Sequence, residues 1–112
     1  MLAIVRGSLD LLVLKPASWK PMHGVEIIAW LESASGGRLE FDDSAVYQAL
    51  YRMEKAGYLE AEWGVSDNNR RARYYSITPS GRRHLQHETK QLLQSTRLLG
   101  DLLTTSALGE KA

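Results

Sequence analysis

Hydrophobic residues recur at helical spacing in four stretches of this chain. The first stretch predicts a helix over about Val5–Leu14. Pro16 follows it, and proline removes a backbone N–H and pushes the preceding residue toward an extended conformation. The second stretch predicts a helix over about His23–Ser35, which the Gly36–Gly37 pair ends, since glycine adopts the left-handed cap conformation without strain. Residues 38–41 then alternate between polar and apolar types, which favours a short strand.

A third helix is predicted between residues 42 and 57. We expect it to begin near Asp42, because Asp and Ser side chains accept backbone N–H bonds at helix starts, and to end at Gly57. One face has the i, i+3, i+4, i+7 spacing of a buried stripe, made by Val46, Ala49, Leu50 and Met53. The opposite face carries polar and aromatic residues: Ser44, Tyr47, Gln48, Tyr51, Arg52 and Lys55.

A β-hairpin is predicted next, because residues 58–65 and 71–78 alternate with period two around turn-forming residues at 66–69. Leu59, Ala61 and Trp63 should share one face of the first strand. Arg73, Tyr75 and Ile77 should share one face of the second. We interpret Trp63 as packing in the sheet core. Trp19 and Trp30 stay open, with one of them a candidate to shape a pocket.

The last predicted helix begins at Thr78-Pro79, a hydroxyl cap followed by proline at the first helical position, and runs to about Thr104. Leucines seven residues apart and their neighbours resemble a seam for another helix. The residues expected to form this seam are Leu85, Leu92, Leu93, Thr96, Leu99, Leu102 and Leu103. The predicted fold is mainly α with a small β-hairpin. It comprises a winged helix-turn-helix domain (1–78), a C-terminal helix (79–105) and a disordered tail (106–112).

Composition limits the class of protein. The 112 residues contain no cysteine, which excludes a disulfide framework and a cysteine-rich zinc site and fits a reducing cytoplasm. No apolar run approaches the ~20 residues of a membrane span, and the N-terminus lacks a signal-peptide pattern. The net charge is only +1, but residues 66–83 hold five arginines against one aspartate. Such a cluster favours an anionic partner, although a solvated hairpin tip would look the same.

The outer face of the third helix suits the major groove of DNA. A tyrosine such as Tyr47 or Tyr51 offers a hydroxyl for a phosphate and a ring for a thymine methyl. Gln48 can bond to adenine, Arg52 and Lys55 fit phosphates, and Ser44 lies on the same side. The alternative is that one of the two tyrosines packs against the hairpin.

The hairpin tip supplies the second candidate contact. Arg70 and Arg71 are placed to enter a minor groove, and Arg73, closer to the sheet, to grip a phosphate. The alternative for Arg73 is an ion pair with Glu60 or Glu62 across the hairpin, which would contribute little.

Histidines offer fewer candidates. His23, at the start of the second helix, either donates to a phosphate there or has no partner. His84, His87 and Glu88 have a spacing that can hold a metal, but no third histidine or cysteine is near, so a solvated helix face is favoured and no metal or cofactor is expected. No cysteine nucleophile, phosphate loop or serine elbow is present, so the sequence does not predict an enzyme.

The run from Val46 to Leu59 resembles the recognition helix of PadR-type transcriptional regulators. Similar segments continue with Glu62-Trp63-Gly64, the stretch from Asn69 to Thr78, and Gly81, and the opening at Pro21-Met22-His23-Gly24 is also similar. The resemblance covers about residues 4–100. Two positions depart from it: Val25 replaces a common tyrosine and Gln48 a common proline.

The resemblance implies a cytoplasmic homodimer that binds double-stranded DNA at a pseudo-palindromic operator and usually represses. In this reading Tyr47 contacts phosphate, Arg70, Arg71 and Arg73 form a basic wing, and the C-terminal helix dimerises. That single helix is typical of the short form of the family, and a small-molecule inducer has no identified site. The alternative function is a protein-interaction module whose C-terminal helix binds a partner helix.

Overall fold

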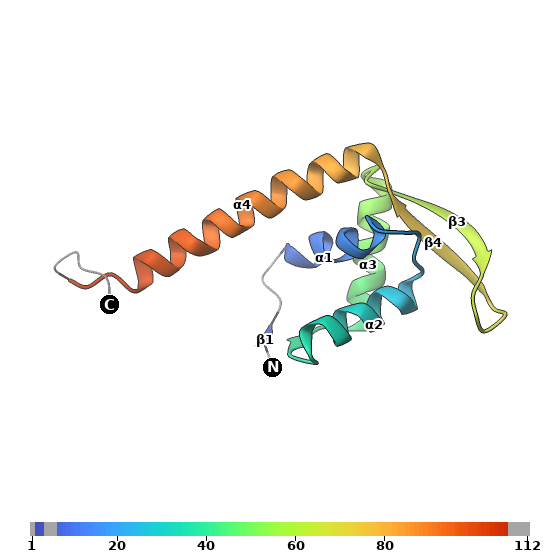
Figure 1. Cartoon of the computed structure of the whole chain (residues 1–112), viewed down its shortest axis with the longest axis horizontal. Coiled ribbons are helices and arrows are strands. Elements are labelled where there is room, and N and C mark those ends of the chain that lie inside the picture. The colour runs from blue at the N-terminus through green and yellow to red at the C-terminus, as the bar shows by residue number, and fades with distance from the viewer. Residues whose placement is uncertain (1, 4–6, 108–112) are drawn as a thin grey trace.

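The computed structural model of the chain describes residues 2–3 and 7–107. The described residues form four helices and two small sheets, whose arrangement is drawn in Figure 1. The helices are α1 (Ser8–Ala17), α2 (Gly24–Ser35), α3 (Asp43–Lys55) and α4 (Pro79–Leu103). The strands are β1 (Leu2–Ala3), β2 (Leu39–Glu40), β3 (Leu59–Val65) and β4 (Arg71–Ile77). The predicted helix start at Val5 and the predicted tail over 108–112 lie outside the described residues.

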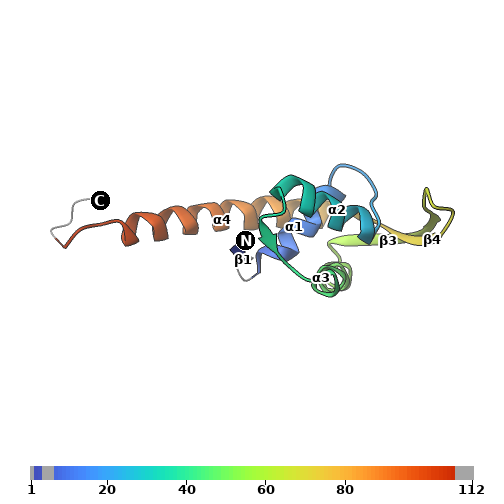
Figure 2. The ribbon, with the colours of Figure 1, turned by 90° about the horizontal axis from the view of Figure 1, so that it is seen from below.

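Helices α1, α2 and α3 pack together into the body of the molecule. The β3–β4 hairpin leaves this body on one side and α4 extends from it on the other, as Figures 1 and 2 both show. The resulting shape is elongated, with principal extents of 62 × 30 × 20 Å. The predicted fold, a winged helix-turn-helix with a long C-terminal helix, is confirmed. Among the described residues, no helix is apolar over enough length to cross a bilayer.

The core lies where the three short helices meet the base of the hairpin. The stripe predicted on α3 is confirmed, because its four apolar side chains are buried. They contact buried residues of the other two helices, and Leu59 and Tyr75 close the core from the two strands of the hairpin. One face of α3 is thus used entirely for packing, which leaves its opposite face to solvent.

Pro16 does not end α1, so the predicted boundary at Leu14 is wrong. The helix continues to Ala17, and Pro16 lies in its last turn with a fully buried ring. The N–H of Ser18 donates to the carbonyl of Leu14 at 3.1 Å, which closes this turn although proline offers no donor. The loss of one hydrogen bond near a helix end is tolerated where the ring fills the core.

The hairpin has the predicted faces. Leu59 pairs with Ile77, and the side chains two and four positions along each strand follow on the same side of the sheet. A backbone bridge joins Met22, just before α2, to Tyr75, with N–H···O distances of 3.0 and 2.8 Å. The strand expected within 38–41 is β2, which pairs in parallel with β1. Its partner was not predicted, because two residues are too few to show a pattern.

The starts of α3 and α4 differ in how they are capped. Asp42 is the N-cap of α3, but its carboxylate makes no capping hydrogen bond, contrary to the mechanism expected from its residue type. Thr78 caps α4 as predicted, accepting from the N–H of Gly81 at 3.0 Å. The Thr78 hydroxyl also donates to the carbonyl of Gly57 at 2.7 Å, which ties the start of α4 to the end of α3.

Gly81 brings the first turn of α4 against the start of the hairpin. A β-carbon at this position would overlap the carbonyl oxygen of Tyr58 and lie 2.8 Å from Cγ1 of Ile77. The obstacle is backbone, so it cannot move away as a flexible side chain would. Any side chain at position 81 must therefore shift α4 relative to the hairpin.

We expect Gly81→Ala to lower the free energy of unfolding by about 1–3 kcal/mol, because overpacking at this contact forces a backbone shift. Urea denaturation followed by circular dichroism measures the change. Gly100→Ala, in the same helix, is the matched control, since nothing lies within 4 Å of a β-carbon there. Its effect should stay within about 1 kcal/mol. Equal losses in both variants would contradict the steric role of Gly81.

Candidate nucleic-acid interface

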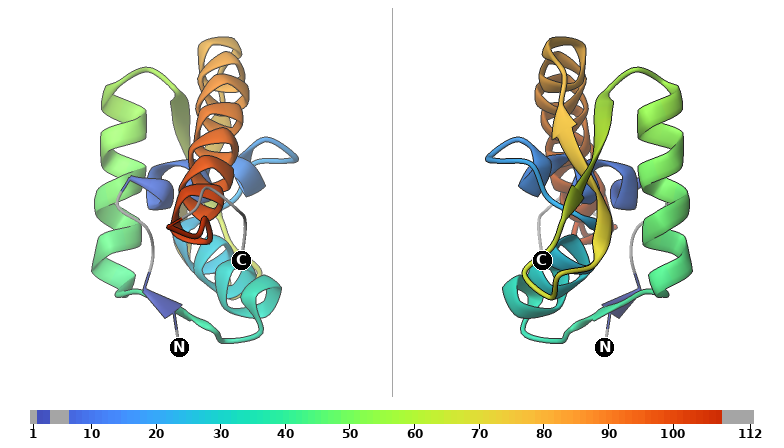
Figure 3. Two further views of the ribbon diagram at one scale, coloured as in Figure 1. Left: turned by 90° about the vertical axis from the view of Figure 1, so that its left-hand side faces the viewer. Right: turned by 90° about the vertical axis from the view of Figure 1, so that its right-hand side faces the viewer.

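The outer face of α3 is open to solvent, as the spacing of its residues predicted. All six of its polar and aromatic residues are exposed. Tyr47 is 46% exposed and Tyr51 is 62% exposed, so a large part of each side chain is open to solvent. The ammonium of Lys55 lies 5.8 Å from the centre of the Tyr51 ring. In Figure 3, α3 stands along one side of the molecule with the hairpin beside it.

Tyr47 lies on the first residue of α2. A β-carbon at Gly24 would overlap the Tyr47 ring, with Cζ 2.8 Å away and the hydroxyl oxygen 2.9 Å away. Gly24 is buried beneath this ring. Because α2 presents backbone at this point, the ring of Tyr47 can settle against it, and the hydroxyl stays at the edge of the helix start. The sequence placed Gly24 on the inner stripe of the second helix, where it is buried, but did not predict its contact with Tyr47.

Two of the predicted phosphate-binding arginines are held by carboxylates. Arg52 donates to Asp10 of α1 at 2.6 Å, and this hydrogen bond raises the pKa of the guanidinium above its usual range. Arg73 donates to Glu54 of α3 at 2.7 Å, so the partner expected across the hairpin, Glu60 or Glu62, is wrong. The Nε atom of Arg73 is buried without a hydrogen-bond partner. These pairs position the two side chains and leave each with fewer free donors.

Trp63 is 58% exposed, which corrects its predicted place in the sheet core. It shares the face of Leu59 and Ala61, as expected, but burial on this face falls from Leu59, which is buried, through Ala61 to the exposed Trp63. The guanidinium of Arg71 lies 4.4 Å from the centre of the Trp63 ring, and that of Arg73 lies 5.8 Å from it. The exposed part of the hairpin thus has one aromatic and cationic face.

The hairpin tip is a tight turn that presents Arg70 to solvent. Asn69 adopts a left-handed conformation with φ of 58°, and its N–H donates to the carbonyl of Ser66 at 2.8 Å. The N–H of Ser66 donates to the carbonyl of Arg70, also at 2.8 Å. Asn69 therefore serves the turn, as its residue type suggested, because asparagine tolerates this conformation better than most residues.

His23 is the N-cap of α2. Its Nδ1 accepts from the N–H of Glu26, and the carboxylate of Glu26 accepts from the N–H of His23, a reciprocal capping box. The ring meets that of Tyr74 edge to face, with centroids 5.3 Å apart. The predicted alternative of a histidine without a partner is wrong. Only Nε2 remains to face a ligand, and it lies 3.5 Å from Glu26.

These parts surround a pocket of about 360 Å³ between the start of α2, α3 and the hairpin. Burial raises the pKa of Tyr75, which forms part of its wall. The residues that line the pocket are His23, Gly24, Val25, Tyr47, Trp63, Arg71, Ala72, Arg73 and Tyr75. Two arginines, a tyrosine hydroxyl and a helix start meet there, a combination that suits a phosphate group.

His84, one of the α4 residues whose spacing suggested a metal site, makes an aromatic contact instead. The ring of His84 stacks on Tyr58 at the start of the hairpin, with centroids 4.0 Å apart and planes 12° apart. Over the described residues, no three histidine, cysteine or acidic side chains come together as a metal site would require. His84 instead helps to dock α4 on the body.

The predicted seam of α4 divides into two parts. Leu85 is partly buried against the core of its own chain and also lines the groove between α1 and α4. Farther out, Leu93, Leu99, Leu102 and Leu103 are exposed, together with Leu98, which was not predicted. Thr96 is exposed and donates to the carbonyl of Leu93 at 3.1 Å. Leu92 is half-buried.

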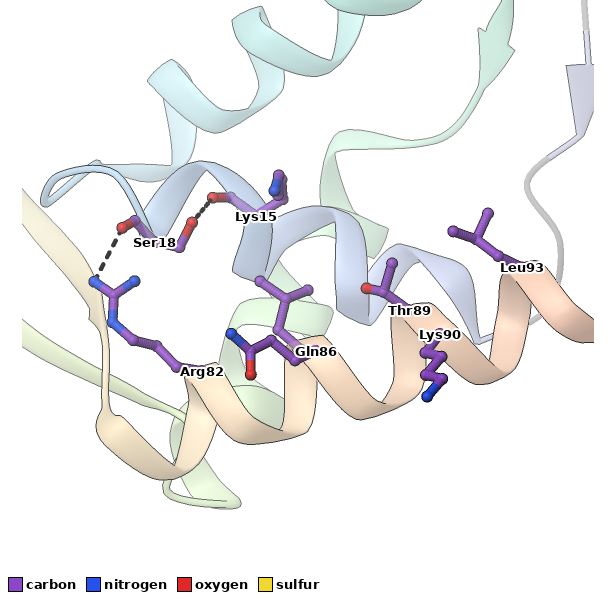
Figure 4. A pocket seen from close by; sticks show the side chains of 8 residues that line it. Lys15, Ser18, Arg82, Gln86, Thr89, Lys90 and Leu93 are labelled. Atoms are coloured by element: carbon purple, nitrogen blue, oxygen red, sulfur yellow. Dashed lines mark hydrogen bonds between the residues drawn. The ribbon is translucent and has the colours of Figure 1, made fainter.

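A groove of about 500 Å³ separates α1 from the first half of α4 (Figure 4). Arg82 crosses one end and donates to the carbonyl of Ser18 at 3.0 Å. Leu93 marks the other end, where the exposed leucines begin. Trp30 lines a different pocket, of about 340 Å³, beside α1 and β2, and it meets Trp19 edge to face.

Comparisons with known proteins agree with this geometry. The model of the transcriptional regulator PadR-like family matches residues 13–87. A protein of Lysinibacillus sphaericus, named uncharacterized protein X, is 32% identical over 89 residues, 79% of this chain and 81% of that protein. A PadR family transcriptional regulator structure from Eggerthella lenta is similar with a TM-score of 0.73 and 28% identity, covering 90% of this chain and 86% of that one.

A transcriptional regulator structure from Clostridium thermocellum has a TM-score of 0.75 and 23% identity, covering 84% of this chain and 88% of that one, and supports the fold. The family model covers well over half of the chain and includes α2, α3 and the hairpin. Regulators of this family bind DNA and are not enzymes. The chain therefore belongs to the PadR-like family of transcriptional regulators.

Proposed function

We propose that this chain is a repressor that binds a pseudo-palindromic operator as a homodimer. The observation that carries the proposal is the open outer face of α3 beside the cationic face of the hairpin. An exposed helix and a neighbouring basic hairpin can contact the major groove and the adjacent phosphate backbone of one DNA duplex. The apolar side chains of α3 are buried on its opposite face, so core packing does not use the exposed face.

On this reading, α3 enters the major groove. Gln48 and Tyr51 meet base edges, because both project from the middle of the exposed face. Ser44 and Lys55, at the two ends of the helix, contact the backbones on either side. Arg52 adds a positive charge close to a phosphate while it keeps its hydrogen bond to Asp10.

The pocket beside α3 receives a phosphate of the adjacent backbone. The Tyr47 hydroxyl donates to it, and His23 lies at the rim with Nε2 as its remaining donor. Arg71 supplies charge from the hairpin and Arg70 reaches farther along the groove from the tip. Arg73 contributes mainly as a brace, because Glu54 already occupies its guanidinium.

The outer half of α4 supports the dimer. Several exposed leucines on one helix that extends from the body are costly in water, and a second copy of the same helix would cover them. The seam then comprises Leu92, Leu93, Thr96, Leu99, Leu102 and Leu103. A heterologous partner helix is the second candidate for the same leucines, and the oligomeric state of the pure protein separates the two.

The binding reaction should depend steeply on salt, because neutralised phosphates release counterions. We expect Arg70→Gln with Arg71→Gln to reduce the slope of log affinity against log salt by about 2, since two phosphate contacts are lost. Fluorescence anisotropy with duplex DNA from upstream of the protein's own gene measures this slope.

The charge-matched control is Arg38→Gln with Lys90→Gln. Arg38 follows the far end of α2 and Lys90 projects from α4, so both lie outside the proposed interface. This double variant should retain the slope of the unmodified protein. The same slope in both double variants would contradict the proposed phosphate contacts of the hairpin tip. Equal affinity of the wild-type protein for the upstream duplex and a scrambled duplex would contradict binding to a specific operator.

Gly24→Ala tests the contact between α2 and Tyr47. The new methyl group displaces the tyrosine ring, which we expect to weaken DNA binding about fivefold, the equivalent of one hydrogen bond. The free energy of unfolding should change by less than about 1 kcal/mol, because alanine suits a helix and the obstacle is a movable side chain. In a Tyr47→Leu background the same substitution should add no further loss. If Gly24→Ala weakened DNA binding just as much in the Tyr47→Leu background, its effect would not act through Tyr47.

Leu93→Glu with Leu99→Glu tests the seam. Two carboxylates in the middle of an apolar interface should convert the dimer to a monomer, because each would be buried without a partner. Sedimentation velocity reads the oligomeric state directly. Gln94→Glu is the control, since helical periodicity places position 94 on the opposite side of α4 from Leu92, Leu99 and Leu103, and it should leave a dimer. A wild-type protein that sediments as a monomer would instead favour a heterologous partner.

A further inference from the structure

Trp63 is a large aromatic side chain placed where it cannot serve the core. It is not part of the buried core cluster, and more than half of its surface is open. Its nearest charged neighbour is Arg71, on the adjacent strand one diagonal position away on the same face. The guanidinium carbon lies over the Trp63 ring, 4.4 Å from its centre, which is well within the range of a cation–π contact.

Arg71 differs from other arginines of the body in what holds it. Arg52 and Arg73 each donate to a carboxylate, and Arg82 donates to a backbone carbonyl. Over the residues that the structure describes, no carboxylate lies within ion-pair distance of Arg71. Its guanidinium lies instead over the ring of Trp63, which is uncharged.

A stack holds a guanidinium without using its hydrogen-bond donors. The N–H groups of arginine point outward in the plane of the group, whereas a ring below it contacts only the flat face. An ion pair would occupy those donors and neutralise the charge. Arg71 is therefore ordered by Trp63 while its charge and its fork of donors stay available for an anion.

The two faces of the hairpin carry opposite charges. Glu60 and Glu62 alternate with Trp63 along β3, so their exposed carboxylates project from the opposite face. The face with Trp63 and Arg71 turns toward Tyr47 and the start of α2, where all of them line one pocket. An anion is attracted to this face and repelled from the other.

We propose that Trp63 is a positioning residue for Arg71: its ring holds the guanidinium ready for a DNA phosphate in the pocket between α2, α3 and the hairpin. The inference rests on the proposed function, since it assumes that DNA is the anion. Pre-ordering one long side chain spares part of the entropy lost on binding. Trp63 thereby raises affinity through Arg71.

The free protein provides the first test. In its ¹H–¹⁵N spectrum the Nε–H of Arg71, assigned by its loss in Arg71→Lys, should be shifted by the ring current of Trp63. Trp63→Leu should return it to the position of an exposed arginine, and Trp63→Phe should keep part of the shift. An unshifted signal in the wild-type protein overturns the stack whether or not the protein binds DNA.

The second test is a double-mutant cycle on DNA affinity. Trp63→Leu should weaken binding about two- to fivefold, the range of an exposed cation–π contact. Trp63→Phe should recover part of the loss. In the Trp63→Leu background, Arg71→Ala should cost less than it does in the wild-type protein, because the two residues act as one unit. Additive losses would mean that Trp63 touches DNA independently, which overturns the proposal.

A matched control excludes a general effect of removing a surface tryptophan. Trp19 is exposed to a similar extent and has Lys15 6.0 Å from its ring, but it lies outside the pocket. Trp19→Leu should leave DNA affinity unchanged. Wild-type protein that binds no DNA would refute the proposed function alone. DNA binding with an additive cycle would refute the positioning role alone.

Discussion

The ion pair between Arg73 and Glu54 holds the β3–β4 hairpin and α3, the two elements proposed to contact DNA, in a fixed orientation to one another. Glu54 is on α3 and Arg73 is on β4, so this contact joins the hairpin directly to the helix. Both side chains are partly buried, and the Nε of Arg73 has no other partner. Removing either member would leave a charge in a partly dry site, which is usually more costly than the pair itself is stabilising. The angle of the hairpin is therefore held by charge as well as by packing.

A second set of contacts joins this pair to the rest of the body. The bridge between Met22 and Tyr75 anchors the start of α2 to β4, and Tyr47 rests on Gly24 at the same place. Three elements distant in sequence thus converge within one small region. Each offers a group that suits a phosphate, but none would be placed correctly without the others.

Periodic patterns in the sequence predicted much of the fold. The helices, the hairpin, its shared faces and the open side of α3 follow from spacing alone, because burial of apolar side chains dominates each of them. Pro16 shows the limit: a local rule ends the helix there, whereas the core accepts the buried ring. Trp63 shows another, since the alternation of a strand fixes which face a residue shares but not how far the body of the molecule extends beneath it. The carboxylates that hold Arg52 and Arg73 lie 42 and 19 residues away, beyond the range of any local pattern.

Helix α4 has a further consequence for how two binding surfaces are spaced. Its 25 residues correspond to about 37 Å, close to one turn of B-DNA, and its first turn is locked to the hairpin by Gly81 and Thr78. In the proposed dimer, α4 sets the distance between the two copies of α3. That distance depends on which leucines of the two α4 helices pair with one another. Changes to a few residues of α4 would then alter the spacing of the half-sites, while the residues of α3 that contact the bases remain unchanged.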